Sequence, residues 1–202
     1  MLMKHYSLIL RILGLLFIVL GISAYINSLD NGSPGQIFWF CYVALVLIGA
    51  GIFIKSPNIV LTQLNIMTIP LLVWVLDFFY VLIARETLFG ITDYFFLPGP
   101  ILGKIITSQH LFTIPLAIFS LYLIKIKRKD LWKFSFIEMS LIFLLSRLLT
   151  LEEYNINCVY MSCMNFSLGQ SWFYPFWWFI IVFFMVFLTN YIFIRLKFLK
   201  NG

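Results

Sequence analysis

Lys125-Ile126-Lys127-Arg128-Lys129-Asp130-Leu131-Trp132-Lys133, a loop between two long apolar runs, holds five of the fourteen basic residues of the chain. Short loops rich in Lys and Arg remain on the cytoplasmic side of a membrane. The run before this loop, residues 110–124, is therefore expected to lead inward. The run after it, residues 134–150, is expected to lead outward.

The composition is that of an integral membrane protein. Of the 202 residues, 62% are hydrophobic and only 11% are charged, which leaves too little polar surface to cover a soluble globule of this size. We therefore predict a single all-α membrane domain over residues 1–202. The net charge of +6 is accounted for by basic loops on the inner side, so we expect membrane lipids and no nucleic acid as partners.

Six apolar runs predict six transmembrane helices, since a span needs about 20 residues; the runs are residues 7–26, 37–54, 66–84, 110–124, 134–150 and 172–196. Residues 87–109, between the third and fourth runs, are apolar but interrupted by Gly and Pro, and we interpret them as interfacial or partly re-entrant. Pro70 either lies in the first turn of the third helix or kinks a helix that begins earlier. We keep the first run as a span rather than a signal peptide, because Ile22 disrupts the small-residue pattern of a cleavage site.

The basic residues are distributed unequally over the two sides of this arrangement. Arg85 and Lys104 fall outside, and Arg147 falls within the fifth span. The remaining eleven fall on the inner side: Lys4, Arg11, Lys55, Lys125, Lys127, Arg128, Lys129, Lys133, Arg195, Lys197 and Lys200. This bias predicts a protein of the cell membrane with both termini in the cytoplasm.

Asp77 and Arg147 are ionisable residues near the outer ends of the third and fifth predicted spans. A charge at the centre of a membrane helix costs at least about 2.5 kcal/mol, so such residues mark candidate sites. Their depths are compatible, which leaves two interpretations open: a structural ion pair between two helices, or a direct role in binding or catalysis. Glu138 lies on the opposite helix face from Arg147, close enough to the inner end to reach Lys133 or the lipid headgroups, and we interpret it as structural.

His110 begins the fourth span at the outer level and is the candidate general base. Cys41, near the outer start of the second span, is the candidate nucleophile, because a thiol beside an imidazole is activated. A plainer interpretation stays open for each residue. His110 could face interfacial water or cap a carbonyl group, and Cys41 could be a small core side chain.

Cys158 and Cys163 share the last outer loop, where an oxidising exterior favours a disulfide. Two thiols without a nearby His or a third Cys do not complete a zinc shell, so we expect no metal. No phosphate-binding Gly loop or haem motif is present, and we expect no cofactor. Asn31 and Asn165 each begin an N-x-S sequon on a predicted outer loop. Four residues at the start of the sixth span are expected to form an aromatic belt: Trp172, Tyr174, Trp177 and Trp178.

The second half of the chain combines a His at the start of the fourth span, a basic connection, a short fifth span, an Asn-containing outer segment and a Pro/Trp-rich entry to the last span. Here these are His110, residues 125–133, residues 134–150, Asn155-Ile156-Asn157 and Trp172-Phe173-Tyr174-Pro175-Phe176-Trp177. This layout resembles that of the YwaF-like six-span integral membrane proteins and, more remotely, the androgen-induced threonine hydrolases of fatty-acid esters. The resemblance implies that the His is partnered by a Cys or Thr near the outer end of the second span. Cys41 lies there, although its flanking residues do not reproduce the family motif.

These residues support two hypotheses of function. The first is a membrane-embedded lipid-ester hydrolase or acyltransferase, in which Cys41 attacks, His110 acts as base and Arg147 steadies an oxyanion, carboxylate or phosphate. The second is a non-enzymatic role, either a small-molecule transporter that uses Asp77 and Arg147, or a subunit, among partner membrane subunits, whose polar residues hold its helices in register. Labelling with an acyl-reactive probe separates the two hypotheses.

Overall fold

Eight α-helices account for most of the computed structural model, which describes residues 2–164 and 172–200. The helices are α1 (Leu2–Asp30), α2 (Phe40–Phe53), α3 (Pro57–Ala84), α4 (Asp93–Phe96), α5 (Ile101–Thr107), α6 (Thr113–Ile124), α7 (Trp132–Leu149) and α8 (Tyr174–Phe193). Within the described residues the only β pairing is an isolated bridge between Ile126 and Lys200. The prediction of an all-α fold is confirmed.

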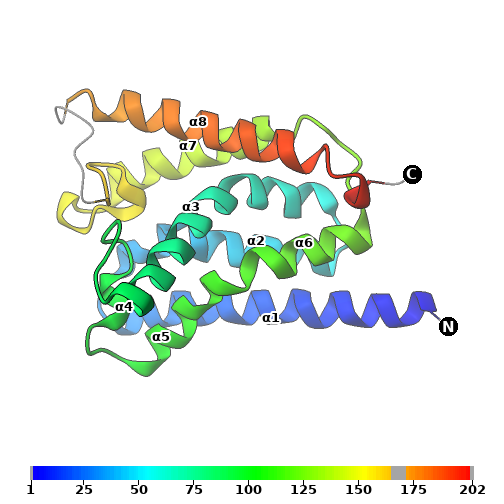
Figure 1. Cartoon of the computed structure of the whole chain (residues 1–202), viewed down its shortest axis with the longest axis horizontal. Helices are drawn as coiled ribbons and strands as arrows, with labels where there is room; N and C mark the ends of the chain where they lie inside the picture. The colour runs from blue at the N-terminus through cyan, green and yellow to red at the C-terminus, as the bar shows by residue number, and fades with distance from the viewer. Residues whose placement is uncertain (1, 165–171, 201–202) are drawn as a thin grey trace.

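The helices α1, α2, α7 and α8 run broadly along the long axis of the molecule (Figure 1). The second half of α3 crosses this axis obliquely, and α4 and α5 lie toward one end. Both termini lie at the opposite end, together with the basic loop between α6 and α7. We call this the terminal end, and the end that carries α4 is the loop end. The sequon at Asn165 falls outside the described residues.

The expected number of six spans is not supported by helix length and composition. Three helical stretches in the described part are long and apolar enough to cross a membrane, Tyr6–Asp30, Pro57–Ala84 and Tyr174–Phe193. A fourth span is formed if Ile101–Leu111 and Thr113–Ile124, which meet at an angle of 49°, are taken as one broken span. The helix α2 has 14 residues, or about 21 Å, which is short for a hydrocarbon core of about 30 Å.

The helix α7 has 18 residues but carries three charged side chains, Lys133, Glu138 and Arg147.

The helix α3 begins at Pro57, nine residues before its expected start at Ile66, so Pro70 lies inside the helix and not in its first turn. Proline at the first position of a helix loses no hydrogen bond, whereas Pro70 removes an amide from the helical ladder. The residues from Asn58 to Asn65, which we expected to precede the membrane helix, therefore belong to it.

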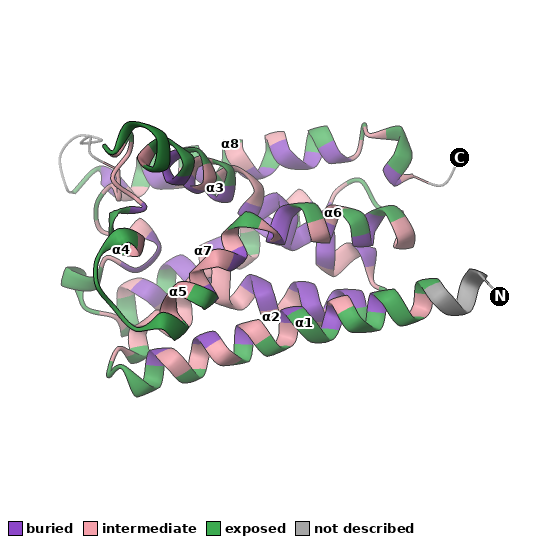
Figure 2. Ribbon diagram, turned by 60° about the horizontal axis from the view of Figure 1, so that its bottom comes forward, coloured by how far each residue is buried: buried purple, intermediate pink, exposed green. Residues whose placement is uncertain are grey.

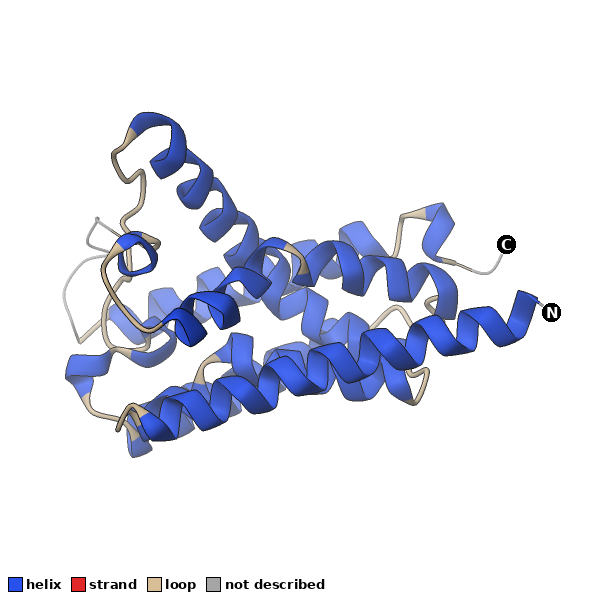
Figure 3. Ribbon diagram, turned by 90° about the horizontal axis from the view of Figure 1, so that it is seen from below, coloured by secondary structure: helices blue, strands red, loops and turns tan. Residues whose placement is uncertain are grey.

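Large apolar side chains are exposed along the outer surfaces of the helices, as expected if lipid and not water surrounds them. On α1, seven such residues are 48–59% exposed: Leu8, Ile12, Leu15, Val19, Ile22, Ile26 and Leu29. Figure 2 shows exposed and half-buried positions along the length of α1, and Figure 3 shows that this helix is continuous. The described helices are thus compatible with a membrane location.

The helices α1 and α2 approach closely at glycine. A Cβ atom placed on Gly49 would lie 2.7 Å from the Gly14 carbonyl oxygen and 2.8 Å from the Ile18 amide nitrogen, and one placed on Gly14 would lie 2.9 Å from the Gly49 oxygen. Small residues let membrane helices pack backbone against backbone. This contact fixes α1 against α2 in the half of the molecule nearer the termini.

Candidate functional site

Asp77, in α3, is fully buried, and its carboxylate accepts hydrogen bonds from a loop. Each carboxylate oxygen accepts bonds from residues 88–92, in which Gly90 has a φ of 77°. The donors are the amides of Leu88 (2.9 Å) and Phe89 (2.7 Å) to Oδ1, and the amides of Ile91 (3.0 Å) and Thr92 (2.9 Å) and the Thr92 hydroxyl (2.7 Å) to Oδ2. A turn with a left-handed residue can point successive amides at one anion. Asp77 therefore fastens the loop before α4 to α3.

The expected ion pair between Asp77 and Arg147 is not formed. The one ion pair among the described residues joins Arg128 and Asp130. The Arg147 guanidinium carbon lies instead 4.8 Å from the centre of the Tyr160 ring and 5.8 Å from that of Phe143. Cation–π contacts provide Arg147 with partners inside its own part of the fold. A binding role for either residue stays a prediction.

His110 lies in an aromatic cluster at the loop end. Its ring stacks on Trp74 with centroids 4.7 Å apart, and its Nδ1 lies 2.6 Å from the Thr107 carbonyl oxygen. The Trp74 indole donates to the Tyr94 hydroxyl at 3.1 Å, which connects α3 to α4. The plainer sequence interpretation, a histidine that caps a carbonyl group, describes this geometry.

Cys41 forms no hydrogen bond with His110 in the described structure. It is a free, half-buried cysteine that packs against the hydrophobic core. A nucleophile and its base must lie within about 2.6–3.2 Å to transfer a proton directly, and the ring nitrogen of His110 that has a partner is turned to Thr107. The four predicted site residues are thus distributed over separate sets of contacts.

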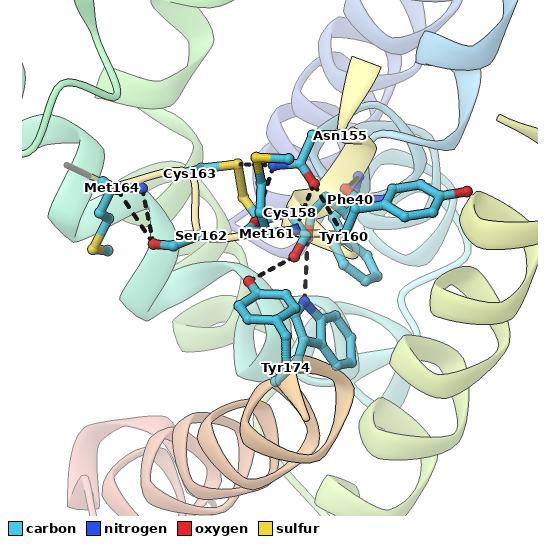
Figure 4. The surroundings of a disulfide bond; sticks show 11 residues. Phe40, Asn155, Cys158, Tyr160, Met161, Ser162, Cys163, Met164 and Tyr174 are labelled. Atoms are coloured by element: carbon cyan, nitrogen blue, oxygen red, sulfur yellow. Dashed lines mark hydrogen bonds between the residues drawn. A yellow bond between two sulfur atoms is a disulfide. The ribbon is translucent and has the colours of Figure 1, made fainter. Parts of the chain in front are cut away.

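The loop after α7 is closed by the predicted disulfide, which is present between Cys158 and Cys163 (Figure 4). Asn155 supports the same turn. Its Oδ1 accepts from the amides of Tyr160 (3.0 Å) and Met161 (3.2 Å), and its Nδ2 donates to the Met161 oxygen (3.0 Å). Asn155 has a φ of 39°, in the left-handed region that Asn tolerates better than most residues.

Asn157 joins this loop to the rest of the molecule. Its Oδ1 accepts from the Phe40 amide at 2.9 Å, and its Nδ2 donates to the Phe38 oxygen at 2.6 Å and to the Ser146 hydroxyl at 3.1 Å. One amide side chain, 7% exposed, thus ties the start of α2 to α7. The sequence drew attention to the Asn155–Asn157 segment only through a resemblance, and nothing in its residue types distinguishes a buried amide from an exposed one.

Two of the four residues expected to form an aromatic belt do not face outward. Tyr174 and Trp178 are buried, at 5% and 6% exposure. The Tyr174 hydroxyl donates to the Cys158 oxygen at 2.8 Å (Figure 4), and the Trp178 indole donates to the Asn157 oxygen at 3.3 Å. Buried Tyr and Trp require such partners for their polar atoms. These two side chains hold the disulfide loop over the start of α8.

A groove beside Glu138 was not predicted. The Gln63 amide donates to both Glu138 oxygens, at 2.7 and 3.0 Å. These residues line a cavity of about 360 Å³ with Asn58, Arg128 and Phe134. The Asn58 Oδ1 is buried without a partner in the described structure. The polar residues of positions 58–65 were the available signal, but they were placed outside the membrane helix because α3 was expected to begin at Ile66.

A buried amide network lies near this groove. The Asn65 amide donates to the Ser135 hydroxyl (3.2 Å) and to Asn190 Oδ1 (3.1 Å), and the Asn190 amide donates to the Lys129 oxygen (2.9 Å). Asn65 and Ser135 are fully buried and Asn190 is 3% exposed. Hydrogen bonds between helices are worth about 0.6–2 kcal/mol each in membrane proteins. The network joins α3, α7 and α8 to the basic loop.

These features define an all-helical protein with several helices suited to a membrane and with polar contacts that mainly connect its own elements. No protein-family model, no curated protein and no solved structure matches the chain.

Proposed function

We propose that this chain is a non-enzymatic multi-pass membrane protein, a subunit whose buried polar residues hold its helices and its loop end in register. The observation that carries the proposal is the state of Asp77, whose carboxylate accepts five hydrogen bonds from one loop. An acid that is occupied in this way has little capacity left for a substrate. His110 and Arg147 likewise have partners within the fold.

The proposal includes six helices within the cell membrane and both termini in the cytoplasm. Support comes from the placement of both termini and the basic loop at one end of the bundle (Figure 1). The helices α2 and α7 would complete the bundle, and their place in the membrane would depend on packing against neighbouring helices. The helix α2 packs along α1 through Gly14 and Gly49. The positive-inside rule then places the terminal end in the cytoplasm.

No hydrogen bond between Cys41 and His110 supports hydrolysis or acyl transfer in the described structure. One experiment distinguishes such an enzyme from the proposed subunit. The purified protein is incubated with a long-chain p-nitrophenyl ester, and release of nitrophenol is followed together with the mass of the chain. We expect the same background rate for the protein and for its Cys41→Ser variant. An acyl thioester on Cys41 that disappears in His110→Ala would overturn the non-enzymatic assignment.

Transport is the second candidate, and the groove beside Glu138 favours it. An acidic residue inside a membrane domain is a functional candidate by default, because proton relays use such residues. Glu138 has one side-chain donor, Gln63, and opens on a cavity of about 360 Å³. In liposomes with an internal pH-sensitive dye and an imposed potassium diffusion potential, transport of protons predicts a flux that Glu138→Gln abolishes. Equal, low flux from both proteins favours the subunit.

A further inference from the structure

The basic loop and the C-terminal segment border a second, open cavity of about 320 Å³ at the terminal end. Its lining is four basic and two aliphatic residues, and we call it the basic cavity: Lys127, Arg128, Lys129, Lys200, Ile126 and Ile194. Pockets for small ligands begin at about 300 Å³. The volume of the basic cavity lies at the lower end of this range, which is enough for a phosphate headgroup.

Hydrogen bonds to main-chain oxygens fix the backbone around the basic cavity. The Ile126 amide donates to the Leu199 oxygen at 2.7 Å, and the Lys125 ammonium donates to the Phe198 oxygen at 2.8 Å. On the other side of the loop, the Asn190 amide holds the Lys129 oxygen at 2.9 Å. These bonds bring the backbone of two distant parts of the sequence, each of which carries basic residues, to one pocket.

The charges around the basic cavity are only partly balanced. The Arg128 guanidinium donates to Asp130 at 3.0 and 3.2 Å and lowers the pKa of that carboxyl group. This is the one ion pair within residues 2–164 and 172–200, so Lys127, Lys129 and Lys200 have no acidic partner there. Like charges that face one space repel each other, and an anion placed between them relieves the repulsion.

We propose that the basic cavity binds the phosphate group of an anionic membrane lipid. Lys and Arg together are the usual partners of phosphate, and basic pockets at the cytoplasmic ends of membrane helices recognise lipid headgroups. Ile126 and Ile194 supply an apolar wall for the part of the lipid next to the phosphate. The inference rests on the proposed membrane location and not on the absence of catalysis.

The full chain, purified in a neutral detergent, is titrated with phosphatidylglycerol, with phosphatidylcholine and with inorganic phosphate, and affinity is measured from the shift in thermal stability. We expect phosphatidylglycerol to bind at least about ten-fold more tightly than phosphatidylcholine. Each lysine near an anionic lipid contributes about 1 kcal/mol, so Lys127→Gln and Lys200→Gln should each weaken binding about five-fold. Lys127→Arg and Lys200→Arg should retain it.

The matched control is Lys197→Gln, which removes one exposed charge from the same C-terminal segment without touching the cavity lining. We expect this variant to change the affinity less than two-fold. Equal losses in Lys197→Gln and Lys200→Gln would reduce the effect to general surface charge and overturn the proposal. Inorganic phosphate that binds as tightly as the lipid would also overturn it, as would equal affinity for the two lipids. None of these results would bear on the acyl-ester test of the proposed function.

Discussion

At the scale of single residues, the structure shows how a carboxylate can be buried without an opposite charge. Asp77 has four amides and one hydroxyl as donors, and these replace the hydration that the charged group loses on burial. From sequence, an intramembrane acid and an intramembrane base at similar depth suggested a pair. The sequence could not show that the loop after α3 turns back, since that depends on the local backbone around Gly90.

Asp77→Asn should destabilise the protein. The substitution replaces one acceptor oxygen by an amide group that faces backbone donors, and each buried donor left without a partner costs roughly 1–3 kcal/mol. With two amides affected, we expect a loss of about 3 kcal/mol in the free energy of unfolding, measured by thermal denaturation in detergent. Asp93→Asn is the control, because Asp93 is exposed in the adjacent α4. A loss of stability as large in Asp93→Asn would contradict the role assigned to Asp77.

A double-mutant cycle tests the separation of Asp77 from Arg147. Because each residue has its own partners, the losses of stability in Asp77→Leu and Arg147→Leu should add within about 0.5 kcal/mol. An ion pair predicts a different result, since removal of both charges would recover much of the cost of removing one. Recovery of stability in the double variant would therefore support the ion pair between Asp77 and Arg147 and contradict their separation.

At the scale of elements, glycine determines how α1 meets α2. Gly49→Ala would bring a methyl group within 2.7 Å of the Gly14 oxygen and of an Ile18 side-chain carbon, and overpacking of this kind typically costs 1–3 kcal/mol. We expect a loss of about 2 kcal/mol by thermal denaturation. The matched substitution Gly103→Ala, in α5 with no atom within 4 Å of the new methyl group, should be neutral or stabilising. Equal losses at both positions would contradict the role assigned to close packing at Gly49, because a methyl group at position 103 meets no atom within 4 Å.

The disulfide between Cys158 and Cys163 should stabilise the loop that Tyr174 and Trp178 hold in place. The two cysteines are separated by 5 positions in the sequence. In the loop-entropy description, a ring of this size lowers the entropy of the unfolded chain and so stabilises the fold by about 2 kcal/mol. The double variant Cys158→Ser with Cys163→Ser should lose about that amount, whereas Cys41→Ser, at a free cysteine, should lose less. Mass spectrometry of protein purified without reductant provides the direct check. Two free thiols at positions 158 and 163 would show that the bond does not form.

At the scale of the whole molecule, the helical class and the approximate positions of the long helices could be predicted, because apolar runs and loop charge extend over whole segments. The ends of helices could not, since Pro57 begins α3 well before the apolar run becomes continuous. The expected start at Ile66 also concealed the groove, because it left Asn58 and Gln63 outside the membrane helix. Pairings across the fold, such as Gln63 with Glu138, depend on how helices pack, and one sequence carries no direct signal for that.

The arrangement of the chain across the membrane can be tested by labelling. The loop between α2 and α3 is the informative position, because it shows whether α2 crosses the membrane. Single cysteines are placed at Asn31, Lys55 and Lys129 in a Cys41→Ser background and are exposed to an impermeant maleimide in intact cells. If α2 crosses the membrane despite its 14 residues, Asn31→Cys reacts at once, and Lys55→Cys and Lys129→Cys react only after permeabilisation. If α2 does not cross, positions 31 and 55 lie on one side and behave alike. Reaction of Lys129→Cys in intact cells would reverse the orientation that the basic loop predicts.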